Sequence, residues 1–326
     1  MFFEISRAPA GGVEEGKQGM QSSTVATAVK AVRHPERVRA ALSHPGQIAS
    51  WSRHALARKV FVGASDEYRS ESDTGAYVAL VQAAVKDYKA FTTFRRHPNY
   101  VVVLEHVTRQ EGQAYLDILR KDAPDLIDRI EEFKSNDVVG SPRVFDYPGI
   151  GKISPTTLRY VKVASDLRKL FGAEPGHNVA EVGVGYGGQM LVCDTAFHMR
   201  QYDLFDLAPV LNLVERYLES HLLNSAYHTS TLNQCLGEES YDLVISNYAF
   251  SELPSALQRR YIEKVLATAK RGYLTMNSGT PETYFQHNKL SLAQLRELLP
   301  GFEVLPERPL TCPGNYIIAW GHSETL

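Results

Sequence analysis

The sequence predicts an α/β fold, in which a mostly parallel sheet with an antiparallel carboxyl-terminal edge follows a helical amino-terminal region. Three observations lead to this prediction. Short apolar segments alternate with amphipathic helical segments from residue 156 onward, as in a parallel sheet covered on both faces. The last two apolar segments are joined through Pro and Gly instead of a helix, which indicates a hairpin. The residues before 135 show helical periodicity without strong strand alternation.

Length and composition indicate an ordinary globular protein. The chain has 326 residues, of which 44% are hydrophobic and 22% are charged; this length favours two domains. A net charge of -2 gives no long-range attraction to nucleic acid or to an anionic membrane, so we expect a small-molecule partner. No run of about 18 apolar residues is present, which argues against a spanning helix. With Glu4 in a poorly apolar start and no C-x-x-C pair, we expect a cytoplasmic protein.

Composition changes along the chain divide it into four parts. Residues 1–23 are rich in Gly, Ser, Gln and Glu and are predicted to form a flexible arm. Residues 24–135 are predicted to form a helical domain or cap. Residues 136–155 concentrate Gly, Pro, Ser and Asn, which is typical of a linker. Residues 156–326 then form the predicted catalytic domain.

The expected elements follow the two hydrophobic periodicities. Helices are expected at 46–62, 74–91, 110–121, 124–134, 156–171, 209–218 and 255–270. Strands are expected at 178–182, 201–205, 241–246, 272–277, 302–306 and 315–321. In the first of the well-patterned helices, Tyr77, Val81, Ala84 and Tyr88 recur at helical spacing.

The stretch "AEVGVGYGGQM" joins the first strand to the next helix through four glycines. Gly183, Gly185 and Gly187 alternate after the strand, and Gly188 opens the helix. Glycine allows positive φ and close approach of a ligand to the backbone, and a helix start presents unpaired N–H groups. The same residues satisfy G-x-G-x-x-G, so both a nicotinamide dinucleotide and S-adenosylmethionine are candidate ligands.

Glu181 favours S-adenosylmethionine over a dinucleotide. It precedes the first glycine, where a carboxylate suits a cationic ligand and opposes a pyrophosphate. The terminal hairpin also replaces the second βαβαβ half of a dinucleotide fold. Asp206, at the end of the second strand, is expected to bind the ribose hydroxyls, with Leu207 near the adenine. Asn233 and Asn247 complete the expected cofactor residues.

Four segments together resemble a known family. They are "AEVGVGYGGQM", "YDLFDLAPVLNLVERYL", "YDLVISNYAFSELP" and "RGYLTMNSG". The chain resembles a class I S-adenosylmethionine-dependent methyltransferase with a Rossmann-like domain, and within that class the sugar O-methyltransferases of bacterial natural-product tailoring. The resemblance implies methyl transfer to a hydroxyl of a sugar or glycosylated small molecule. The sugar comes from the resemblance alone.

The general base is expected past the carboxyl ends of the strands, because ligands of open α/β sheets bind there. Glu252 is the acid of "SNYAFSELP", at a place where many O-methyltransferases carry a histidine, and His287 is the second candidate. Tyr248, together with Arg96 and His106 from the helical region, is expected to contact the acceptor. No clustered metal-ligand motif appears, so we expect no metal, and a homodimer is an open possibility.

Two other functions remain open from the residues. The glycine pattern also fits an NAD(P)-dependent oxidoreductase. A protein that keeps the fold but lacks a base would bind S-adenosylmethionine without catalysis.

Overall fold

The computed structural model describes residues 75–277 and 289–322. Both ranges belong to one compact unit of the chain. The predicted arm 1–23, the predicted helix 46–62 and the candidate base His287 lie outside the described residues.

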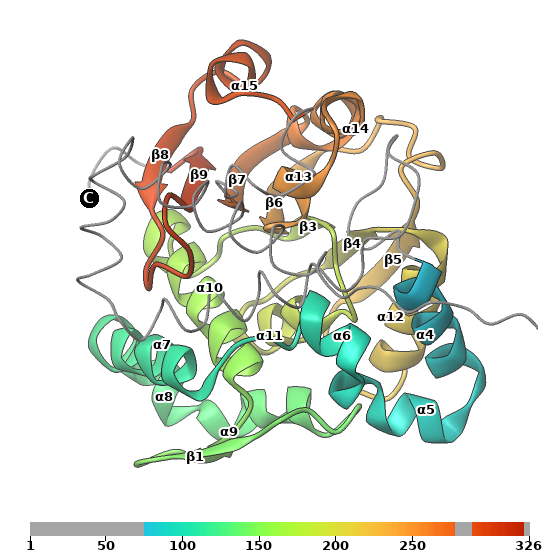
Figure 1. Cartoon of the computed structure of the whole chain (residues 1–326). Coiled ribbons are helices and arrows are strands. Elements are labelled where there is room, and N and C mark those ends of the chain that lie inside the picture. Colours follow the sequence, from blue (N-terminus) through green and yellow to red (C-terminus); the bar gives the residue numbers. More distant parts are fainter. Residues whose placement is uncertain (1–74, 278–288, 323–326) are drawn as a thin grey trace, which may run out of the picture. The chain divides into compact units, whose positions relative to one another are not determined.

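A seven-stranded sheet organises the described chain (Figure 1). Its strands lie in the order β5-β4-β3-β6-β7-β9-β8. Their bounds are β3 Asn178–Val182, β4 Gln201–Phe205, β5 Ala226–Ser230, β6 Tyr241–Asn247, β7 Ala269–Met276, β8 Glu303–Pro306 and β9 Tyr316–Trp320. Strands β5, β4, β3, β6 and β7 pair in parallel, whereas β9 is antiparallel to β7 and β8. The predicted fold class, an α/β fold whose mostly parallel sheet has an antiparallel carboxyl-terminal edge, is confirmed.

Helices on both sides of the sheet connect the strands (Figure 1). They are α10 Pro155–Phe171, α11 Gly188–Ala196, α12 Ala208–Leu218, α13 Ala249–Glu252, α14 Ser255–Tyr261 and α15 Leu292–Leu298. The start of α10 is fixed by Ser154, whose side chain accepts a hydrogen bond from the Thr156 N–H. Its end is fixed by Gly172 at a φ of 89°, a conformation that glycine adopts without a steric penalty.

The elements differ from the prediction at three places. The helix expected over 255–270 is shorter, because α14 passes into a π-helical turn, η4 Ile262–Leu266, and β7 already begins at Ala269. Strand β5 was not expected, and the linker contains a small hairpin of β1 Phe145–Tyr147 and β2 Gly151–Ile153.

The described residues that precede the sheet in the chain are mainly helical. Its elements are α4 Gly75–Lys86, α5 Tyr88–Thr93, η2 Phe94–Arg96, α6 Pro98–Val103, α7 Arg109–Asp122, α8 Pro124–Asp128, α9 Ile130–Phe133 and η3 Lys134–Asp137. A capping box between Thr108 and Glu111 begins α7. Tyr88 does not continue the apolar face of α4, and it is 75% exposed. The reason is that Asp87 caps a new helix at that point.

Two hydrophobic clusters lie on the opposite faces of the sheet. On β3, Val179 belongs to one cluster, while Ala180 and Val182 belong to the other, as the alternation of a strand requires. The first cluster runs from Tyr77 to Ile317 and takes residues from both sides of the predicted linker. The four-part division of the chain stays a prediction.

Candidate active site

The glycine turn joins β3 to α11 at the carboxyl edge of the sheet. Gly183, Gly185 and Gly187 have φ values of 77°, 58° and 91°, a region that residues with a Cβ rarely adopt. The Gly183 N–H donates to the carbonyl of Phe205 at 2.8 Å, which ties the turn to the end of β4. The alternating glycines are therefore required by the backbone path itself.

The missing Cβ atoms also permit close packing within the chain. A Cβ on Gly183 would lie 2.0 Å from the Cβ of Ala249, and one on Gly185 would lie 2.9 Å from Leu104 Cδ1. Leu104 comes from the region in front of the sheet, directly after α6. A ligand at this turn would therefore have Leu104 as part of its wall.

Asp206 directly follows β4, beside the glycine turn. One of its oxygens accepts from the Val184 N–H at 2.9 Å, and the other accepts from the Leu207 N–H at 2.7 Å. These bonds hold the carboxylate between the glycine turn and the start of α12. Leu207 is the residue before α12 and is half-buried.

Glu181 is buried within the sheet, whereas the sequence predicts a carboxylate that contacts a cationic ligand. It is 2% exposed and accepts a hydrogen bond of 2.8 Å from the Tyr202 hydroxyl. Burial raises the pKa of this carboxyl to about 8, against the smaller lowering effect of the Tyr202 bond. A carboxyl with this pKa is largely neutral at pH 7, so Glu181 contributes little negative charge there.

Strand β6 delivers Asn247 and Tyr248 to the same edge. The Asn247 amide donates to Gln189 Oε1 on α11 at 3.1 Å. Tyr248 has a φ of 68°, an unfavourable value for a tyrosine, and such strain is concentrated at functional sites. Its hydroxyl donates to the Glu307 carboxylate and lies 3.3 Å from Thr311 Oγ1.

Glu252 lies at the end of α13, next to the end of β7. Its Oε1 accepts from the Asn277 amide at 2.7 Å, and the side chain is half-buried. Ser251 fixes this corner, because its hydroxyl donates to the Tyr248 carbonyl at 2.6 Å and accepts from the Asn277 N–H at 2.9 Å. The Lys289 ammonium donates to the Asn277 carbonyl at 2.8 Å and interacts electrostatically with Glu252.

Glu307 adds an acid that the sequence reading did not include. It is 6% exposed, and burial raises its pKa. Besides the Tyr248 hydroxyl it accepts from the N–H and the hydroxyl of Thr311, each at 2.8 Å. It follows β8 without a recognisable motif, and only the antiparallel return of β9 places it beside the end of β6. No local sequence signal identifies it.

Arg95 is a second residue whose role the sequence reading missed. Arg95 belongs to the basic stretch "FRRHPNY" and is 0% exposed. Its Nε donates to Glu105 at 2.5 Å, and its guanidinium carbon lies 4.4 Å from the centre of the Tyr186 ring. Tyr186 is the large residue of the glycine turn. The residues that precede the sheet in the chain therefore pack against the glycine turn through the contact between Arg95 and Tyr186.

The other predicted residues are spread more widely. Asn233 is exposed and accepts from Arg260 at 2.8 Å. Arg96 is also exposed, and it donates to the carbonyl of Ser141 at 2.6 Å. His106 is half-buried directly after Glu105. The roles of these residues at the site stay predictions.

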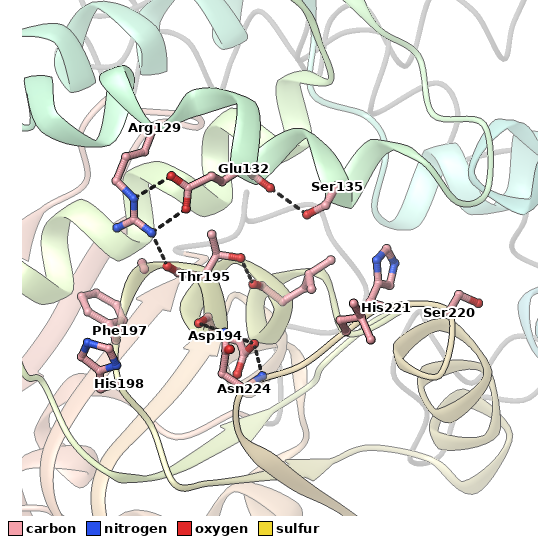
Figure 2. Close-up of a pocket in the computed structure, with 13 residues that line it drawn as sticks. Arg129, Glu132, Ser135, Asp194, Thr195, Phe197, His198, Ser220, His221 and Asn224 are labelled. Atoms are coloured by element: carbon pink, nitrogen blue, oxygen red, sulfur yellow. Dashed lines mark hydrogen bonds and ion pairs between the residues drawn. The ribbon is translucent and has the colours of Figure 1, made fainter.

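A surface pocket of about 620 Å³ lies elsewhere, at the carboxyl ends of α11 and α12 (Figure 2). Arg129 crosses it, donating to Glu132 and to the Thr195 carbonyl, each at 2.7 Å. The nine residues of α11 separate this pocket from the glycine turn, which is about 13 Å along the helix. This pocket is therefore separate from the glycine turn.

Two features are absent from the described residues. Within 75–277 and 289–322, no group of three or more His, Cys, Asp or Glu side chains is arranged to hold a metal ion. In the same ranges no helix has the length and apolar character that crossing a membrane demands.

Comparison with known proteins gives distant similarities of fold. No family model matches the chain, and no curated protein matches it. Among solved structures, magnesium protoporphyrin IX methyltransferase from Synechocystis PCC 6803, with bound S-adenosylhomocysteine, is 16% identical with a TM-score of 0.38, covering 62% of this chain and 95% of that one. An O-methyltransferase from neocarzinostatin biosynthesis, in complex with S-adenosylmethionine and a naphthoic acid, is 16% identical with a TM-score of 0.36, covering 51% and 57%. At these scores the fold assignment rests on the strand order and directions of this chain itself.

Proposed function

We propose that the protein is an S-adenosylmethionine-dependent O-methyltransferase that acts on a hydroxyl of a sugar or glycosylated small molecule. The observation that carries the proposal is the glycine turn at the edge of this sheet, with the Asp206 carboxylate fixed beside it by the Val184 N–H at 2.9 Å. The antiparallel β8–β9 edge supports it against a dinucleotide fold, which adds a second parallel half. The sugar follows from the family resemblance.

The residues at the edge suit the parts of this cofactor. Asp206 would accept the ribose hydroxyls, and the turn from Gly183 to Gly187 would let the adenosyl group approach the backbone. Leu207 and Asn233 are proposed to border the base, and Asn247 the other end of the molecule. S-Adenosylmethionine supplies a methyl group already activated on a sulfonium. The protein's own contribution is to align the acceptor oxygen and exclude water.

An alcohol acceptor also has to lose its proton. Glu252 is the proposed base, with His287 as the second candidate, and Tyr248 borders the acceptor. The Asn277 amide donates to Glu252 at 2.7 Å and so orients the carboxylate, and a placed base contributes about 100- to 10,000-fold to the rate. Glu252→Gln should lower the methyl-transfer rate about 100- to 10,000-fold while leaving the affinity for the cofactor unchanged.

The cofactor proposal is tested by calorimetry with S-adenosylhomocysteine. We expect the wild type to bind it and Gly185→Val to lose the binding, because a valine is excluded at a φ of 58° and would meet Leu104. Gly75→Val is the matched control, since nothing lies within 4 Å of a Cβ at Gly75.

Product analysis tests the reaction. Mass spectrometry of a glycoside panel should show a gain of one CH2 group that requires S-adenosylmethionine. Saturable binding of NADH with none of S-adenosylhomocysteine would instead support an oxidoreductase. Cofactor binding without transfer to any glycoside, and without an effect of Glu252→Gln, would support a binding protein.

A further inference from the structure

Arg159 is a buried cation at the site that the proposed function has not used. It lies on α10 and is 6% exposed. Throughout the described residues, no carboxylate oxygen comes within 4 Å of its guanidinium, whereas the buried Arg95 is paired with Glu105 at 2.5 Å. Its Nε is buried and has no hydrogen-bond partner within the described part of the chain.

The contacts of Arg159 place its guanidinium between the glycine turn and the end of β6. Its Nη2 lies 3.5 Å from the carbonyl oxygen of Leu104, the residue whose side chain covers Gly185. Its guanidinium carbon lies 5.9 Å from the centre of the Tyr248 ring and 5.4 Å from that of the Tyr160 ring. Such ring contacts offset only a small part of the cost of burying an unpaired charge.

We infer that Arg159 binds a carboxylate of a ligand held over the glycine turn. A planar guanidinium with an unused Nε–H matches a carboxylate through two parallel hydrogen bonds. The inference rests on the proposed function, because it needs a ligand at this edge of the sheet. Asp206 follows β4 and Tyr248 follows β6, with β3 between these two strands in the sheet. A ligand held by Asp206 would therefore have to extend across the end of β3 to reach the Arg159 guanidinium near Tyr248.

Two sources can provide this carboxylate. One is the amino-acid end of the methyl donor, and the other is an acidic sugar or acid group on the acceptor. Both give the same pairing with Arg159, and they differ in which ligand loses affinity when the guanidinium is removed.

Calorimetry on the full chain separates the two sources. The ligands are S-adenosylhomocysteine and 5′-methylthioadenosine, which lacks the carboxylate. If the donor supplies it, Arg159→Met weakens S-adenosylhomocysteine binding about tenfold or more and leaves methylthioadenosine binding unchanged. Arg159→Lys should retain part of the affinity. Arg168→Met, on the same helix but ion-paired with Asp125 on the surface, should behave as wild type.

The acceptor source is tested with 4-nitrophenyl glucuronide and 4-nitrophenyl glucoside, in the presence of S-adenosylhomocysteine. If the acceptor supplies the carboxylate, the wild type prefers the glucuronide about tenfold or more, and Arg159→Met loses the preference while binding S-adenosylhomocysteine normally.

Stability distinguishes ligand binding from a structural role. Because an unpaired buried charge costs free energy, Arg159→Met without ligand should unfold at the same temperature as the wild type or at a higher one. A lower midpoint with equal loss of both nucleosides overturns the inference, and so do unchanged affinities for all four ligands. If the wild type itself does not bind S-adenosylhomocysteine, the proposed function fails as well.

Discussion

Two buried ionisable residues near the glycine turn are stabilised in opposite ways. Glu181 lies on the sheet with the Tyr202 hydroxyl as its hydrogen-bond donor and stays largely protonated, with a pKa of about 8. Arg95 keeps its charge through Glu105 at 2.5 Å and lies 3.8 Å from Asp137. Each predicts a different response to substitution.

Glu181 should make stability fall as pH rises. Its pKa is raised by burial from 4.5 to about 8 in the folded chain, so the folded state binds the proton more tightly than the unfolded state. Its contribution is therefore fully present below pH 4.5 and is lost as pH rises to about 8. The loss is on the order of a few kcal/mol. Urea unfolding at several pH values gives the unfolding free energy as a function of pH. This free energy should fall less steeply with pH in Glu181→Gln than in the wild type, and an equally steep fall would contradict the burial of this carboxyl.

Arg95→Met should be strongly destabilising, because it leaves Glu105 charged, 5% exposed and unpaired with Arg95. Removing one partner of a buried pair costs about 3–5 kcal/mol. Combining it with Glu105→Gln should restore part of this loss, since the uncompensated charge is then gone. Denaturant unfolding of the two single variants and the double variant measures the coupling; strictly additive effects would show that the two side chains are independent.

At the scale of elements, the sequence predicts the helices and strands that have a clear local pattern of apolar residues. Strands β3 and β4 are found at the predicted residues because their apolar runs are bounded by turn residues. Strand β5 escapes prediction because it is an edge strand with mixed exposure in "AYHTS", so no apolar run marks it. Glu307 and Arg159 escape for another reason. Their neighbours come from β6, the hairpin and the residues before the sheet, which are contacts that no local period encodes.

The pairing of β7 with β9 depends on a glycine. Gly272 lies opposite Trp320, and a Cβ at Gly272 would lie 2.1 Å from the indole ring. Gly272→Ala should therefore lower the unfolding free energy by about 1–3 kcal/mol through overpacking, as measured by thermal or urea unfolding. Gly75→Ala is the control, because nothing lies within 4 Å of its Cβ position. Equal stability of Gly272→Ala and the wild type would contradict the observed packing of the antiparallel edge.

At the scale of the whole described chain, the site is assembled from both sides of the predicted linker. Leu104 covers Gly185, Arg95 lies under Tyr186 at 4.4 Å, and Asn136 donates to the Tyr186 hydroxyl at 3.1 Å. Composition predicts where the linker lies, but it does not report which side chains pack across it.

The predicted catalytic domain can be tested as a fragment. One hydrophobic cluster joins Tyr77, Leu116 and Phe133 to Tyr186 and Tyr217. A chain of residues 156–326 would therefore expose an apolar face to water, at a free-energy cost of about 25 cal/mol for each Å² exposed. We expect this fragment to bind a hydrophobic dye, to unfold without a cooperative transition and to bind S-adenosylhomocysteine far more weakly than the full chain. A cooperative transition with full-length affinity would show instead that residues 156–326 fold alone, as the composition boundary predicts. The helical region would then be an added cap, and Arg95 would affect the glycine turn only in the joined protein.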